Sequence, residues 1–274
     1  MEFIVIVIFI IALFRVFKNK LSADFEPGQE HEQPQPIVIS PAEEVLIAAR
    51  MTYYHMLTDE EKVRFLSRTS QLRRSLAFVS REEGFDVSDE MRVLISASLA
   101  QLSFGWDELK PPHLEQIDLF SESFYSRLVE SDVKGLTLPN RVMLSWHYFQ
   151  EGYQIDNDKV NLGLHELAHA VWDERYWDSK LRAELEQWSE VAADEFQRMQ
   201  RHVDSGFFRD YAATNTLELW ACSVECFFEA PVEFQQKLPQ LYDALAGFIN
   251  QDMAGRAMRV PVRAEVKTVP NQIA

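Results

Sequence analysis

The residues best suited to metal chemistry lie in one short segment, where His165 and Glu166 are followed by His169. On a helix, positions i and i+4 share a face and lie about 6 Å apart along the axis, so both imidazoles can reach one metal ion. Glu166 is rotated by about a quarter-turn, which places it beside the metal, where it can take a proton from an activated water. This HExxH pattern predicts a zinc-dependent peptidase, with two histidine ligands and a glutamate as general base.

The alternative for this segment is a solvated helix that carries two histidines by chance. Apolar residues at Leu164, Leu167 and Val171 give the helix a face for packing. A packed helix with this spacing favours the metal site over the solvated helix.

A catalytic zinc needs a third protein ligand and keeps one position for water. A second predicted helix, capped by Asn215 or Thr216, carries Glu218 and Glu225 on one face. Its other residues are mostly apolar, and a buried carboxylate there needs a partner, either a metal ion or an arginine. Cys222 lies one turn after Glu218 and could also face the metal, although a cysteine among aromatic residues is more often part of the core.

Several motifs together resemble the zinc metallopeptidases of the Mlc titration factor A family, which share a catalytic fold with the anthrax lethal factor peptidase domain. The similarity extends from about residue 60 to residue 250. It rests on GFDVSDEMR (84–92), VMLSW (142–146), Asn161 with the HExxH segment, and YAATN (211–215) followed by Glu218 and the segment 225–231.

This resemblance implies a set of roles in the site. It implies one Zn²⁺ per chain bound by His165, His169 and Glu218, Glu166 as base, Tyr211 as hydroxyl donor to the oxyanion, and Glu225 and Asn161 as residues that support the ligands. Glu225 stays open as an alternative metal ligand. The family usually has an aspartate three residues after the second histidine, but this chain has Trp172 there and Asp173 next. An aspartate that orients a ligand histidine would therefore be shifted to position 173 or lost.

Two classes of function fit these motifs. The first is a peptidase that acts on a peptide or protein, as an aminopeptidase or an endopeptidase. The second is a regulatory protein that binds zinc and sequesters a transcription factor or another partner, as the family's reported repressor binding implies. Glu166 favours the peptidase, because zinc binding alone does not need this residue.

Composition limits the partners and the compartment. The chain has 274 residues, of which 47% are hydrophobic and 26% are charged, and its net charge is −16. These values are ordinary for a soluble globular domain, and the acidity argues against a nucleic-acid partner, which needs a basic surface. Cys222 and Cys226 are four residues apart on a predicted helix, where disulfide geometry is rare, so they indicate a reducing compartment.

The N-terminus departs from globular composition. An unbroken apolar run spans residues 3–14, and Arg15, Lys18 and Lys20 follow it. A span needs roughly 20 apolar residues, so the run is short, and the alternatives are a cleaved signal peptide or a buried helix. The basic C-terminal flank favours an uncleaved anchor in the inner membrane with the domain in the cytoplasm. A purely cytoplasmic protein is the alternative location.

These features divide the chain into four parts. We expect a membrane anchor at 1–20, a polar linker at 21–41, a metallopeptidase domain at 42–259 and a tail at 260–274.

Periodicity predicts more helix than strand in the domain. Helices are expected at 42–57, 59–80, 88–102 and over most of 158–250, and strands at 85–87, 117–120 and 135–146. The pattern indicates an α+β fold of the zincin type, mostly helical, with a small sheet beside the HExxH helix. An extended peptide substrate could pair with the edge of the strand that ends at Trp146.

Overall fold

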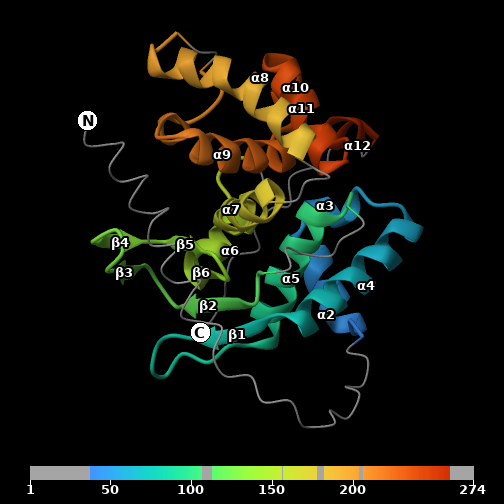
Figure 1. Ribbon diagram of the computed structural model, residues 1–274. Coiled ribbons are helices and arrows are strands. Elements are labelled where there is room, and N and C mark those ends of the chain that lie inside the picture. The colour runs from blue at the N-terminus through green and yellow to red at the C-terminus, as the bar shows by residue number, and fades with distance from the viewer. Residues whose placement is uncertain (1–37, 107–112, 156, 178–181, 204–205, 260–274) are drawn as a thin grey trace, which may run out of the picture. The chain divides into compact units, whose positions relative to one another are not determined.

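The structure is a computed structural model that describes residues 38–106, 113–155, 157–177, 182–203 and 206–259 (Figure 1). The expected anchor, most of the linker and the tail lie outside these residues. Among the described helices, none is both long enough and apolar enough to cross a membrane.

The N-terminal part of the domain is helical, with one strand that the sequence pattern missed. Its elements are α2 (Pro41–Arg50), α3 (Thr52–His55), α4 (Asp59–Ser75), β1 (Ala77–Ser80) and α5 (Asp89–Ser103). Capping boxes at Ser40, Thr58 and Ser88 begin α2, α4 and α5, because each side-chain oxygen accepts a backbone N–H of the first turn.

Three expectations for this part were wrong. The helix expected at 42–57 is interrupted at Met51, whose backbone is extended. The helix expected at 59–80 ends at Ser75, because residues 77–80 form β1 and pair with β2. Residues 85–87 form no strand. Pairing with a strand distant in sequence outweighs local helical periodicity at 77–80.

A four-stranded sheet has the order β1-β2-β6-β5. β2 (Gln116–Phe120) pairs in parallel with β1 and with β6 (Arg141–Ser145), whereas β5 (Gly135–Leu138) runs antiparallel to β6. A separate hairpin consists of β3 (Phe124–Ser126) and β4 (Ser131–Val133).

The single strand expected at 135–146 is a hairpin of two strands. Residues 139–140 form the turn between β5 and β6, and Trp146 begins helix α6 (Trp146–Gln154). β6 has a neighbour on both sides, so the expected pairing of a peptide with its edge was wrong. In the described part of the chain, β5 is the outer strand on this side of the sheet.

The C-terminal half is helical, as expected. Its elements are α7 (Leu162–Trp177), α8 (Arg182–Gln200), the 3₁₀ helix η1 (Asp210–Ala213), α9 (Thr216–Glu229), α10 (Pro231–Lys237), α11 (Pro239–Ile249) and α12 (Met253–Arg259). Helix α7 contacts β5 and β6 on one side and α9 on the other (Figure 1). The small sheet beside a mostly helical body confirms the α+β class.

A cluster of three tryptophans holds α7 against α8 and α9. The ring centroid of Trp188 lies 5.7 Å from that of Trp172 and 5.0 Å from that of Trp220, in edge contacts. The rings of Trp172 and Trp220 are tilted, with their centroids 5.3 Å apart. The Trp220 indole N–H also donates to the Ala168 carbonyl at 2.9 Å, which satisfies its one polar group. These contacts fix the relative position of the two helices that carry the candidate site.

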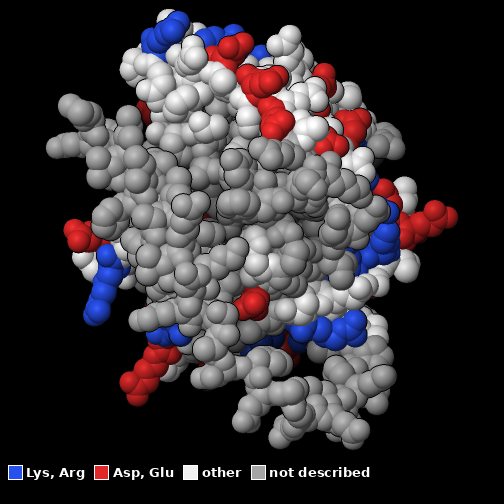
Figure 2. All heavy atoms as spheres, viewed as in Figure 1, with Lys and Arg blue, Asp and Glu red and all other residues white. Residues whose placement is uncertain are grey.

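Charged side chains of both signs are visible among the described residues on one face of the protein (Figure 2). On the face drawn in Figure 2, acidic side chains are frequent over the C-terminal helices, and basic side chains lie among and below them. Among the described residues on this face, both signs of charge are present.

Candidate metal centre

Asn161 sets the start of the helix that carries the HExxH segment. Its side-chain oxygen accepts the Leu164 N–H at 3.0 Å, as an N-cap does, and its amide nitrogen donates to the Gly152 carbonyl at 2.8 Å. Asn161 is almost fully buried. The first turn of α7 is thereby connected to α6. His165 directly follows Leu164, so this connection lies next to the first histidine.

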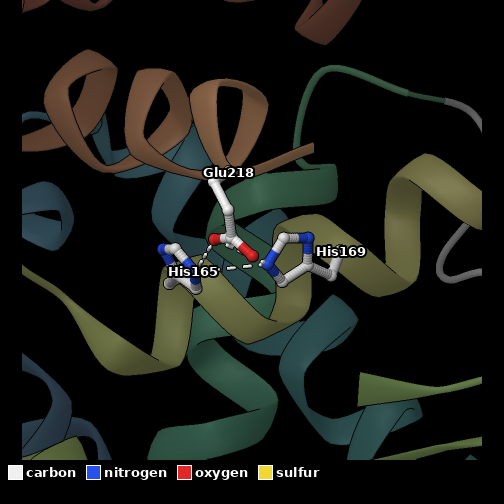
Figure 3. A group of neighbouring side chains, drawn as sticks. All are labelled: His165, His169 and Glu218. Carbon is white, nitrogen blue, oxygen red and sulfur yellow. Dashed lines mark hydrogen bonds and ion pairs between the residues drawn. The ribbon is translucent and has the colours of Figure 1, made fainter. Parts of the chain in front are cut away.

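His165, His169 and Glu218 point their donor atoms toward one another (Figure 3). The His165 Nε2 atom lies 3.2 Å from the His169 Nε2 atom and 3.0 Å from a Glu218 carboxylate oxygen. The same Glu218 oxygen lies 3.5 Å from the His169 Nε2 atom. The three residues that the sequence proposed as ligands therefore meet at one point.

Glu218 comes from the first turn of α9. The Asn215 side chain caps this helix, as expected, by accepting the backbone N–H groups of Leu217 and Glu218 at 2.9 and 3.0 Å. Burial alone disfavours a charged Glu218, but hydrogen bonds and positive charge from His165 and His169 outweigh burial and lower the pKa of its carboxyl group. The partners of this carboxylate are thus the two histidines.

Glu225 holds the far side of His165 and is fully buried. One of its oxygens lies 2.5 Å from His165 Nδ1, and the other accepts the Asn161 backbone N–H at 2.8 Å. With Nδ1 bonded to a carboxylate, the Nε2 lone pair is directed toward His169 and Glu218. Glu225 is placed to orient a ligand.

Arg209 is a site residue that the sequence analysis missed. Its two terminal nitrogens donate to the two oxygens of Glu225 at 2.7 and 3.0 Å. The arginine partner considered for Glu218 therefore serves Glu225 instead. The available signal was a basic residue two positions before Tyr211, together with a buried carboxylate that needed a cation.

His165, Cys222 and Glu225 form a second group of potential donor atoms. The guanidinium of Arg209 already supplies a positive charge at Glu225, so this group does not call for a metal ion. Cys222 is almost fully buried among the apolar residues of α9, which matches its expected place in the core.

Strand β5 contacts the Glu166 side chain directly. The Thr137 hydroxyl lies 2.8 Å from a Glu166 carboxylate oxygen and 2.8 Å from the Glu166 carbonyl oxygen. A Cβ atom at Gly135 would lie 2.6 Å from Glu166 Cγ, so the absence of a side chain there makes room for the glutamate. Burial raises the pKa of Glu166, more than the two histidines lower it. A solvated surface acid, the alternative for Glu166, does not describe this side chain.

Tyr211 stands at the opening of the site on η1. Its side chain is half-exposed, and its ring centroid lies 6.0 Å from that of His165. A cavity of about 670 Å³ is lined by Tyr211, His165 and Glu166, and by residues of α6 and β5. Partial burial and the nearby Glu218 raise the pKa of the Tyr211 phenol. Tyr211 therefore carries a protonated phenol at neutral pH and lines the same cavity as Glu166.

The donor set fits a zinc ion. For zinc bonds of ~2.0–2.1 Å in a tetrahedron, neighbouring donors are about 3.3 Å apart. The three donor separations of 3.0, 3.2 and 3.5 Å bracket that distance. Two imidazole nitrogens and one carboxylate oxygen are also a common protein contribution to catalytic zinc, with the fourth position left for water.

Trp172 does not take the place of a histidine-orienting aspartate. Its ring packs in the tryptophan cluster with Trp188 and Trp220. The side chain of Asp173 lies outside the described part of the structure. For His165, Glu225 supplies the orienting carboxylate from another helix.

Comparison with known proteins identifies similar chains. The profile of the family described as glucose-regulated metallo-peptidase M90 matches residues 29–249. An uncharacterized protein of Synechocystis sp. is 22% identical over 246 residues, which cover 81% of this chain and 86% of the relative. A protein named Mlc titration factor A from Escherichia fergusonii is 25% identical over 230 residues, which cover 76% of this chain and 85% of the relative.

Proposed function

We propose, from the premise that this chain belongs to the glucose-regulated metallo-peptidase M90 family, that it hydrolyses peptide bonds with zinc at His165, His169 and Glu218. The observation that carries the proposal is the meeting of these three donors beside a buried glutamate. A site that only stored zinc would not need Glu166 held next to it.

The residues divide the chemistry among them. A bound zinc ion would supply Lewis acidity toward water and the substrate carbonyl. Glu166 takes the proton from the attacking water and can pass it to the leaving amine, and its raised pKa brings it closer to neutral pH, where a base works best. Thr137 fixes the carboxylate that must do this. The Tyr211 hydroxyl donates a hydrogen bond to the carbonyl oxygen, which gains negative charge as the water attacks.

We expect Tyr211→Phe to reduce kcat for peptide hydrolysis by ~10²–10³, the range for loss of one oxyanion donor. Zinc content and thermal stability should hardly change, because the ring is half-exposed and the substitution removes one oxygen atom. Steady-state kinetics with metal analysis check this. The matched control is Tyr125→Phe, at an exposed position on β3, and a wild-type rate for Tyr211→Phe would remove the oxyanion role.

The substrate backbone aligns along β5 in this proposal. β5 is the outer strand of the sheet in the described residues, and its Gly135 and Thr137 already contact Glu166. An extended peptide that pairs with this edge gains backbone hydrogen bonds and is brought beside the base.

Cleavage of a peptide library by the full-length chain, with and without a metal chelator, tests the function. The result expected is cleavage that the chelator abolishes and added zinc restores. The new termini of the products also distinguish an aminopeptidase from an endopeptidase. Cleavage that is unaffected by chelation would exclude the metal-dependent mechanism.

The second candidate function is binding of a regulatory protein. It is favoured by the similarity to proteins named Mlc titration factor A. The two functions are separated by Glu166→Gln, which keeps the shape of the side chain. A peptidase loses activity through this change, whereas a sequestering protein keeps its zinc and its partner.

We further propose an N-terminal membrane anchor with the domain in the cytoplasm. The support is the apolar run at residues 3–14 with its basic C-terminal flank. We expect the chain to fractionate with the inner membrane and to resist protease added outside intact cells. A mature periplasmic protein that begins after residue 20 would contradict this location.

A further inference from the structure

We infer that Arg209 is a positioning residue that couples the ligand His165 to the oxyanion donor Tyr211. The inference deepens the proposed function and rests on it. It depends on two connections made by one side chain and its own backbone, one to Glu225 and one to the turn that carries Tyr211.

The first connection runs through Glu225. This carboxylate is fully buried, and Arg209 contacts both of its oxygens in a two-pronged ion pair. A buried carboxylate is stable only with a compensating charge and hydrogen bonds. Arg209 supplies that charge, and Glu225 can then remain bonded to His165 Nδ1. One terminal nitrogen of Arg209 also lies 3.4 Å from His165 Nδ1, so Arg209 acts on the metal ligand mainly through Glu225 and partly from beside the ring.

The second connection runs along the chain. Arg209 is the N-cap residue of η1, and its carbonyl oxygen accepts the Ala212 N–H at 3.0 Å. Its side chain also donates to the Lys159 carbonyl at 3.3 Å, just before α7. The Tyr211 side chain is half-exposed, and the Arg209 guanidinium carbon lies 5.7 Å from the centroid of its ring. The turn that presents the hydroxyl is therefore anchored to the same carboxylate that orients His165.

Both the metal ligand His165 and the oxyanion donor Tyr211 depend on the ion pair between Arg209 and Glu225. If the guanidinium is lost, His165 loses a firmly held Nδ1 acceptor, and the turn at 210–213 loses the ion pair that supplements its packing against α9 and α8. The inference therefore predicts that loss of Arg209 weakens the metal site and displaces the oxyanion donor, through Glu225 and the turn at 210–213, although Arg209 also lines the cavity.

The test uses the full-length chain with Arg209→Met and Arg209→Lys. Zinc dissociation constants are measured by competition with a chromophoric chelator, and kcat and KM are measured on a cleaved peptide. For Arg209→Met we expect the zinc dissociation constant to rise by about 10- to 100-fold, as for loss of other groups behind metal ligands. The zinc dissociation constant of Arg209→Lys should lie between those of the wild type and Arg209→Met. An ammonium group keeps the positive charge but cannot bond both Glu225 oxygens in the planar geometry of a guanidinium.

The matched control is Arg256→Met. Arg256 makes a similar two-pronged ion pair with Glu61, at 2.7 and 2.9 Å, between α12 and α4. Its loss should lower Tm while leaving zinc affinity and kcat at the wild-type values. A drop in zinc affinity equal to that of Arg209→Met would show a general stability effect and overturn the inference.

The link to Tyr211 is tested by a double-mutant cycle. Arg209→Met should lower kcat less in the Tyr211→Phe background than in the wild type, because the hydroxyl that it would displace is already gone. Equal losses in both backgrounds overturn this link. Unchanged zinc affinity in the Arg209 variants overturns the link to His165.

Two safeguards keep the test decisive. If Arg209→Met does not fold because it leaves Glu225 without a counter-charge, Arg209→Lys decides both links by the same measurements. If the wild-type chain cleaves no peptide, the proposed function fails, whereas the zinc affinities still support or overturn the role of Arg209 toward His165.

Discussion

We expect peptide hydrolysis to fall by at least ~10² when Glu166 is replaced by glutamine, the low end for loss of a general base. The amide keeps the size of the side chain and can still accept the Thr137 hydroxyl, but it cannot take a proton from water. Zinc content and Tm should stay close to the wild-type values, because Glu166 is not among the three converging donors. Initial rates on the cleaved peptide, with metal analysis of the same samples, measure the effect.

Glu60→Gln is the matched control for this substitution. Glu60 is exposed on α4, so the same chemical change there should leave the rate unaltered. If Glu166→Gln cleaved peptides as fast as the wild type, Glu166 would not be the base and the mechanism would have to be abandoned.

His169→Ala should remove zinc from the purified protein. The substitution takes away one of three donors, and the remaining pair, His165 and Glu218, offers too few ligands for a stable catalytic site. Peptidase activity should disappear with the metal. Metal content by mass spectrometry after dialysis against a weak chelator checks the result.

His147→Ala provides the comparison, since His147 is exposed and contacts only Glu122 and Glu151 among the described carboxylates. It should retain one zinc ion per chain. Full zinc occupancy in His169→Ala would show that the ligands have been assigned incorrectly.

The parts of the site that follow helical spacing could be predicted from the sequence. His165 and His169 share a face because they are four residues apart, and Glu218 and Glu225 share another because they are seven apart. The cap of α9 at Asn215 was also foreseen, since short polar residues satisfy the free N–H groups of a first turn.

The contacts between elements distant in sequence could not be read in this way. Thr137 bonds Glu166 from β5 and Gly135 leaves room for its side chain, whereas the sequence pattern predicts one longer strand at 135–146. The pattern also predicts helix at β1, because the pairing of β1 with β2 leaves no mark in local periodicity. Arg209 belongs to the same class, since its partner Glu225 lies on another element.

Trp172 illustrates how a departure from the family pattern can be explained only in three dimensions. From the sequence, the missing aspartate predicts a lost or shifted contact to a histidine. In the structure, position 172 faces the tryptophan cluster between α7, α8 and α9, where a large ring fills the interior.

The ties between α7 and α9 have a consequence for the order of events in the cell. Glu225, Asn161, Arg209 and the tryptophan cluster join these helices through contacts within the protein itself. Small zinc domains fold only as the ion binds, but this domain has a large core of its own. We therefore expect the chain to fold without metal and to bind the ion afterwards in a site that is already formed.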